Sequence, residues 1–151
     1  RTLLRTSPQL AELQDLVQQS LSKRVFLHYK GFATSQKRLI EKEDGKTAKK
    51  VLYVLRTALT GTHLLKAAEL VTDLRVLIED YKMPEARTLI ARKQLGERAK
   101  LTDDEIATWS QKIDSALALL EDAVEHSVLP DDPPNEPEMQ AALIRIRKSL
   151  L

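Results

Sequence analysis

Cysteine is absent from this 151-residue chain, which excludes disulfides, thiol chemistry and cysteine-based zinc sites. Glycine (4) and proline (6) are scarce and aromatic residues make up only 4%, whereas leucine and alanine abound. This composition favours helices over strands. No apolar run approaches the ~18 residues that would span a bilayer, and no signal-peptide pattern opens the chain. We therefore expect a cytoplasmic protein without a membrane partner.

Length and charge bound the class of protein. With 151 residues, the chain is long enough for one real core, and we expect a single helical domain over residues 1–151. The shares of apolar (42%) and charged (30%) residues are ordinary for a soluble globular protein. A net charge of +2 is too small to indicate nucleic-acid binding from bulk charge alone.

Apolar residues recur with helical spacing almost from end to end. Two helix starts carry capping signals: Ser7 precedes Pro8, and Thr102 stands three residues before Glu105. Residues 25–29 alone could form a strand, but the 3.6-residue period continues beyond them. We expect an all-α helical bundle of six to seven helices without a sheet of three or more strands. The expected helices are, in order, 8–21, 25–42, 47–70, 73–81, 84–96, 102–126 and 138–150.

The most informative helix is the one predicted over residues 47–70. It is strongly apolar, so it should lie deep in the bundle. A buried or half-buried Arg56 then needs a partner, because an unpaired charge out of water is costly. At 100° per residue its polar groups gather within about a quarter of the circumference. This polar stripe consists of Lys49, Tyr53, Arg56, Thr60 and His63.

Motifs of a complete active site are missing. The four glycines are scattered singly and form no phosphate-cradling loop. No Asp-x-Asp pair follows a strand to hold Mg²⁺, and the three histidines lack metal-ligand spacing. We therefore assign no catalytic residue and no metal ligand to this chain.

Five segments of the chain carry recognisable patterns. In order, they are LHYKGFATSQKRLIEK (27–42), KKVLYVLRTALTGTHLL (49–65), AAELVTDL (67–74), LIARKQLGE (89–97) and HSVLPDDPP (126–134). The second resembles a KxxxxxLRxxLTGxHLL pattern, and the fourth a LIxxKxxGE pattern. In this order, the five segments resemble the C-terminal helical half of a family of predicted nucleotidyltransferases in the DNA polymerase β superfamily, one linked to RNA repair. The third departs from the Thr-Gly-Glu of relatives, with Ala67-Ala68-Glu69 in its place.

The resemblance implies an accessory, substrate-side half of a nucleotidyltransferase, a transferase of RNA repair. The family's catalytic half carries a Gly-Ser loop and an Asp-x-Asp pair, and this chain matches neither. It therefore implies a catalytic domain supplied by the same polypeptide or by a partner chain. Mg²⁺ and a nucleoside triphosphate are implied for the full enzyme, with no cofactor bound by this chain alone. RNA or a nucleotide would be the ligand.

Seven residues become candidates for nucleotide or phosphate binding. We expect the first four to line one groove, with Lys30 or Arg38 from the preceding helix near them. The candidates are Lys49, Tyr53, Arg56, His63, Lys30, Arg38 and Lys93.

Each has a structural alternative. Arg56 suits a phosphate, or an ion pair with a core carboxylate of Glu69, Asp73 or Glu97. Tyr53 could stack on a base or simply pack, and the basic candidates could simply face water. His63 fits a hydrogen-bonded core histidine at least as well as a ligand contact. Gly61, costly in a helix, indicates close packing of another helix more readily than a ligand.

Two further functions stay open. One is a HEPN-like nucleotide- or RNA-binding module or ribonuclease, in which Arg56 and His63, separated by six residues, would act on one helix. A homodimer across that face would favour it, although Thr57 is not the usual polar residue after the arginine. The other is a plain helical interaction domain without a ligand.

Overall fold

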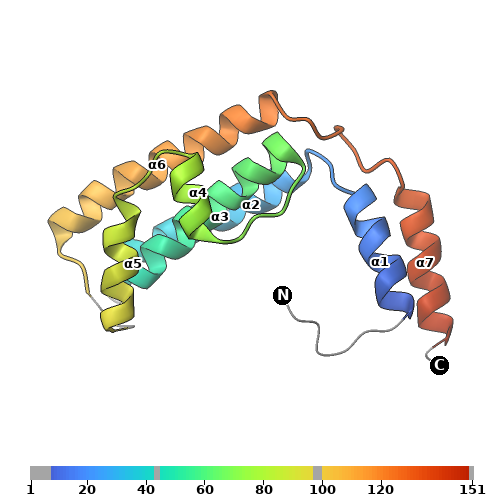
Figure 1. The fold of residues 1–151 in the computed structure, drawn as a ribbon, viewed down its shortest axis with the longest axis horizontal. Helices are drawn as coiled ribbons and strands as arrows, with labels where there is room; N and C mark the ends of the chain where they lie inside the picture. Colours follow the sequence, from blue (N-terminus) through green and yellow to red (C-terminus); the bar gives the residue numbers. More distant parts are fainter. Residues whose placement is uncertain (1–7, 43–44, 97–99, 150–151) are drawn as a thin grey trace. The chain divides into compact units, whose positions relative to one another are not determined.

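The computed structural model describes residues 8–42, 45–96 and 100–149. Over these ranges the chain forms seven helices and no strand, with one isolated antiparallel bridge between Thr47 and Lys100 (Figure 1). The predicted all-α bundle is confirmed. The helices are α1 (Pro8–Gln19), α2 (Val25–Ile40), α3 (Ala48–Ala67), α4 (Leu74–Asp80), α5 (Ala86–Leu95), α6 (Asp103–Glu125) and α7 (Glu136–Ser149).

The chain divides into two compact units. The first combines residues 1–24 with 129–151, and in it α1 packs on α7. Ser20 Oγ donates a hydrogen bond of 2.8 Å to the Asn135 side chain there. The second unit, residues 25–128, holds α2 to α6 and every candidate residue. The expectation of a single domain over the whole chain stays a prediction.

Helix α3 lies at the centre of the second unit, as its apolar sequence predicts. Thirteen of its 20 residues are buried, and it packs against α2 and α6 and also against α4 and α5. Each leucine removed from water contributes about 1.5–3 kcal/mol relative to an exposed one. The unit is therefore built around this helix. In the described part of the chain, no helix is both long and apolar enough to cross a lipid bilayer.

Capping residues fix where the helices begin. Thr102 accepts a hydrogen bond from the Glu105 backbone at 3.2 Å while Glu105 accepts one from the Thr102 backbone at 2.8 Å, so the predicted capping box is confirmed. Thr47 caps α3 by accepting a hydrogen bond of 3.3 Å from the Lys50 backbone. The predicted cap at Ser7 lies outside the described residues. Helix α3 ends at Ala67, three residues before its predicted end, because Ala68 adopts a left-handed conformation (φ 54°).

At Gly61, α3 lies close to α2. A Cβ atom there would lie 2.7 Å from Cβ and Cγ of Tyr29 and 3.0 Å from Cδ1 of Leu120 on α6. These distances are shorter than packed carbon atoms tolerate. Gly61 therefore serves close helix packing, the alternative that the sequence favours.

Candidate functional site

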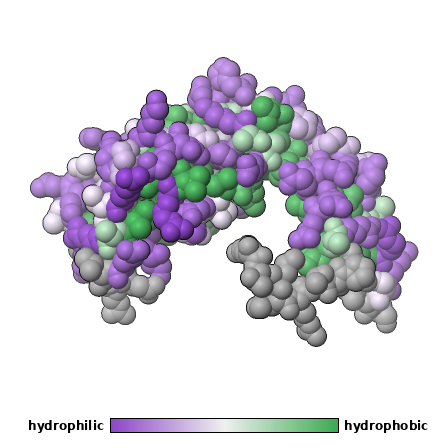
Figure 2. Space-filling view, in the orientation of Figure 1, coloured by the Kyte–Doolittle hydropathy of each residue, from purple (hydrophilic) through white to green (hydrophobic). Residues whose placement is uncertain are grey.

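A groove of about 540 Å³ opens between α3, α4 and α5, all within the second unit. Figure 2 shows hydrophobic surface interrupted by strongly hydrophilic side chains over these helices. The groove brings together four of the seven candidates: Lys49, Tyr53, Arg56 and Lys93. The rest of its lining is Leu52, Thr72, Asp73, Leu74, Arg75, Ile90 and Gln94.

Arg56 is exposed in the groove wall, so the expectation of a buried or half-buried arginine is wrong. The reason is angular: Lys49, Tyr53 and Arg56 of the polar stripe lie on the side of α3 that faces the groove, while most other positions enter the core. The guanidinium lies 5.1 Å from the ring centroid of Tyr53, within range of a cation–π interaction. Arg56 forms no ion pair with any residue that the structure describes, Asp73 and Glu69 included. Glu97, its third predicted partner, lies outside the described residues.

Asp73 is committed to Arg75 instead. Its carboxylate caps α4 by accepting from the Arg75 backbone at 2.9 Å, and also accepts from Nε at 3.0 Å and from Nη2 at 2.6 Å. These hydrogen bonds lower the pKa of Asp73 from its ordinary value to about 2. Asp73 is thus ionised at neutral pH and offsets one of the basic groups around it.

The charge of the lining is unbalanced. Four basic residues (Lys49, Arg56, Arg75 and Lys93) surround one carboxylate among the described residues that line the groove. Arg56 and Lys93 have no carboxylate partner within the described chain. A concave, partly apolar surface with an excess of positive charge attracts anions. The described lining of the groove therefore carries an excess of positive charge.

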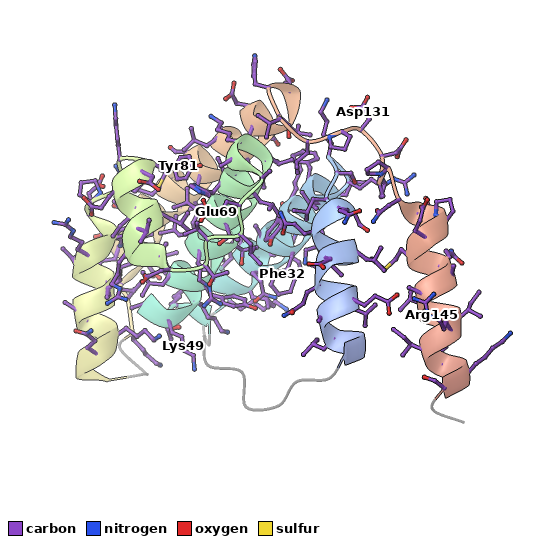
Figure 3. The ribbon with its side chains drawn as sticks, turned by 45° about the vertical axis from the view of Figure 1, so that its right-hand side comes forward. Phe32, Lys49, Glu69, Tyr81, Asp131 and Arg145 are labelled. Carbon is purple, nitrogen blue, oxygen red and sulfur yellow. The ribbon has the colours of Figure 1, made fainter. Side chains whose placement is uncertain are left out.

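The polar stripe is interrupted at Thr60. Its side chain is buried, and Oγ1 donates a hydrogen bond of 3.0 Å to the Val71 carbonyl, so the chain returning from α3 crosses the stripe here. Arg56 lies on the groove side of this crossing. His63 lies beyond it and is absent from the groove lining. Figure 3 labels Lys49 at the start of α3 and Tyr81, which contacts His63, beside α4.

His63 contacts α4 rather than the groove. Its Nδ1 lies 3.3 Å from the Tyr81 hydroxyl and 3.9 Å from a carboxylate oxygen of Asp80, and its side chain is 17% exposed. Burial, and then the Asp80 charge, raise the pKa of Tyr81 above its ordinary value. His63 matches the hydrogen-bonded alternative. Arg56 and His63, the two residues of the HEPN-like hypothesis, therefore have different surroundings: Arg56 lines the groove, whereas His63 contacts Tyr81 and Asp80.

Lys30 and Arg38 lie outside the groove. Lys30 pairs with Glu121 of α6 at 2.9 Å, and its Nζ lies 5.3 Å from the Phe26 ring centroid. Both residues line a separate depression along α2, with Gly31 and Thr34. The expected approach of either residue to the groove is wrong, because both lie on the side of α2 that carries this depression and Lys30 reaches Glu121 of α6.

Sequence reasoning missed Thr72, Asp73 as a groove residue, and Arg75. All three belong to the return segment and the start of α4, which reach Arg56 only through the tertiary fold. One signal was available: Asp73 is the first residue of the helix predicted over residues 73–81, and aspartate is favoured at the N-cap, which fixes the neighbouring backbone. Its pairing with Arg75 could have been inferred from that.

The described residues contain no group of three or more histidine, aspartate or glutamate side chains placed to hold a metal ion. Comparison with family models matches residues 2–145 to RlaP, described as the RNA repair pathway DNA polymerase beta family. Comparisons with curated proteins and with solved structures find no significant match.

Proposed function

The chain belongs to the RNA repair pathway DNA polymerase beta family, and we propose that its groove binds the phosphates of a nucleotide or RNA substrate. The observation that carries the proposal is the charge of the lining, four basic residues against one carboxylate. Arg56 offers a planar fork suited to two phosphate oxygens, and Lys93 adds a point charge. Tyr53, with Arg56 over its ring, supplies an aromatic face for a base.

The groove binds phosphate without catalysing its transfer. Phosphoryl transfer depends on metal ions held by carboxylates, and the one groove carboxylate is occupied by Arg75. The lining therefore does not fit a magnesium site. In this proposal, Mg²⁺ and the reacting triphosphate belong to a catalytic nucleotidyltransferase domain supplied elsewhere. This chain is the accessory part that holds the substrate beside it.

The decisive experiment compares two arginine variants by titration with ATP and with a 5′-phosphorylated RNA. Arg56→Ala should weaken binding by roughly 1.5–3 kcal/mol, the scale of a charge-assisted hydrogen bond. Its melting temperature should stay close to that of the unmodified chain, because Arg56 is exposed and pairs with no described carboxylate. Arg38→Ala is the matched control, since Arg38 is also exposed but lies outside the groove.

Equal loss of affinity in both variants would show a diffuse charge effect and not a site. Loss of stability in Arg56→Ala without loss of binding would retire the proposal, because Arg56 would then be a structural residue.

A further inference from the structure

A row of three rings adjoins the groove. His28 stacks on Phe32 along α2, with parallel rings (2°) and centroids 6.2 Å apart. Phe32 meets Tyr53 of α3 edge to face at 5.7 Å. The Arg56 guanidinium in turn lies 5.1 Å from the Tyr53 ring centroid. We call His28, Phe32 and Tyr53 the aromatic row, and its last member is a groove residue.

The row is open to solvent. Phe32 and Tyr53 are each 37% exposed, and His28 is also exposed. Tyr29 on the same helix shows the contrast, because it is turned inward against Gly61 and burial raises its pKa. Tyr29 is therefore part of the packed contact between α2 and α3, whereas Phe32 and Tyr53 meet at its exposed edge. Aromatic residues make up only 4% of the chain, so two exposed rings in contact beside a cationic groove call for an explanation.

We infer that the aromatic row and the groove together bind single-stranded RNA. Unpaired bases stack on Phe32 and Tyr53, and the phosphates that follow enter the groove at Arg56. Alternation of aromatic faces with a positively charged groove is how proteins bind single strands. A duplex fits poorly, because its base faces are already covered by their neighbours. The inference rests on the proposed function for its phosphate contacts and extends it from one nucleotide to a strand.

Tyr53 and its two neighbours link the groove to the aromatic row. The Tyr53 ring centroid lies 5.7 Å from that of Phe32 and 5.1 Å from the Arg56 guanidinium, so a ligand that contacts Tyr53 is within reach of both. A mononucleotide needs only the Tyr53 end. A strand of several nucleotides extends from the groove along the row toward His28.

The test measures binding of the full chain to a fluorescein-labelled 12-nucleotide oligo(U) RNA and, separately, to ATP. Phe32→Leu keeps an apolar side chain of similar size but removes the ring. It should weaken oligo(U) binding by about tenfold, the effect of losing one stacked base. ATP affinity should stay within about twofold, because Phe32 does not line the groove. Phe32→Tyr should retain oligo(U) affinity.

Leu27→Ala is the control, because Leu27 is 71% exposed on the same helix and belongs to the depression that contains Lys30 and Arg38. It should leave both affinities unchanged. A duplex of the same length should bind more weakly than the single strand. Equal binding of duplex and single strand, or no effect of Phe32→Leu on oligo(U), would overturn the inference.

The outcomes separate the two proposals. If Arg56→Ala weakens ATP and oligo(U) binding while Phe32→Leu changes neither, the phosphate groove stands and the aromatic row is wrong. If Phe32→Leu weakens oligo(U) while Arg56→Ala leaves both ligands unaffected, the phosphate groove is wrong and base stacking alone accounts for binding.

Discussion

Basic residues on the α6 side of the second unit have carboxylate partners, whereas the groove gathers basic residues around one carboxylate. Along the α6 side, Lys30 pairs with Glu121 and Lys66 with Asp122, and Lys37 contacts Asp114. We call these three pairs the α6 seam. Among the described residues that line the groove, Asp73 is the one carboxylate and four residues are basic.

Basic residues thus have different surroundings in the seam and in the groove. Exposed ion pairs between helices, such as those of the seam, contribute little to stability, about 0–1 kcal/mol each, but leave the surface neutral. An excess of positive charge on a concave surface is unfavourable until an anion arrives. The seam thus balances its basic groups with carboxylates, while the described lining of the groove keeps a net positive charge.

The largest expected effect tests the structural side of this comparison. Gly61→Ala places a Cβ 2.7 Å from Tyr29, and overpacking of this kind costs about 1–3 kcal/mol of unfolding free energy. Urea unfolding measures it, and ATP affinity should not change. Gly31→Ala is the control, because a Cβ there meets nothing within 4 Å, and better helix propensity should stabilise it by about 0.5–1 kcal/mol. A Gly61→Ala variant as stable as the control would contradict the packing described.

The next effect changes the groove's charge without removing a cation. Asp73→Asn removes the one carboxylate of the described lining and releases Arg75, while asparagine still caps α4. ATP should bind roughly three- to fivefold more tightly, the scale of one charge near the surface. The gain should shrink in high salt. Unchanged or weaker binding would show that the Asp73–Arg75 pair itself holds the ligand.

A smaller effect is expected in the seam. Lys37→Ala, Asp114→Ala and the double variant form a cycle whose coupling energy should be about 0.2–1 kcal/mol by thermal unfolding. None of the three should alter ATP binding by more than about twofold. A change in ATP affinity as large as that of Arg56→Ala would break the distinction between seam and groove.

The smallest effect concerns pH. The pKa of Asp73 is lowered to about 2 by Arg75, so the stability that this carboxylate adds is present above its ordinary pKa and is lost as the pH falls toward 2. The groove should keep its charge balance from neutral pH to about pH 4. Carbon-13 NMR of the Asp73 carboxyl should show a midpoint near 2. In Arg75→Ala the midpoint should return toward the ordinary value, and an ordinary midpoint in the unmodified chain would refute the pairing.

Much of the fold follows from local signals. Helix α3 is recognisable because its apolar residues surround a narrow polar stripe, and the start of α6 is visible in the capping box of Thr102 and Glu105. The C-terminal end of α3 was predicted too late in the sequence. Nothing local marks Ala68 as left-handed, because alanine rarely adopts that conformation.

The site could be predicted only in part, for a geometric reason. Helical angles place Lys49, Tyr53 and Arg56 on one side, and the groove brings these three together. The same angles put His63 in line with Arg56, but they say nothing of the return segment that crosses at Thr60. The exposure of Arg56 and the position of Arg75 in the groove lining likewise depend on how α4 packs against α3. The binding roles of all these residues stay predictions.

The exposed positions of α3 have a consequence for how this surface can be varied. Lys49, Tyr53 and Arg56 are exposed members of a helix that is otherwise largely buried, and Lys93 is exposed on α5. Substitutions at exposed sites usually alter unfolding free energy by no more than about 0.5 kcal/mol. A library randomised at these four codons should therefore consist mostly of folded members that differ in what they bind. Ligand preference in this scaffold can diverge by sequence drift or by selection without a compensating change in the core.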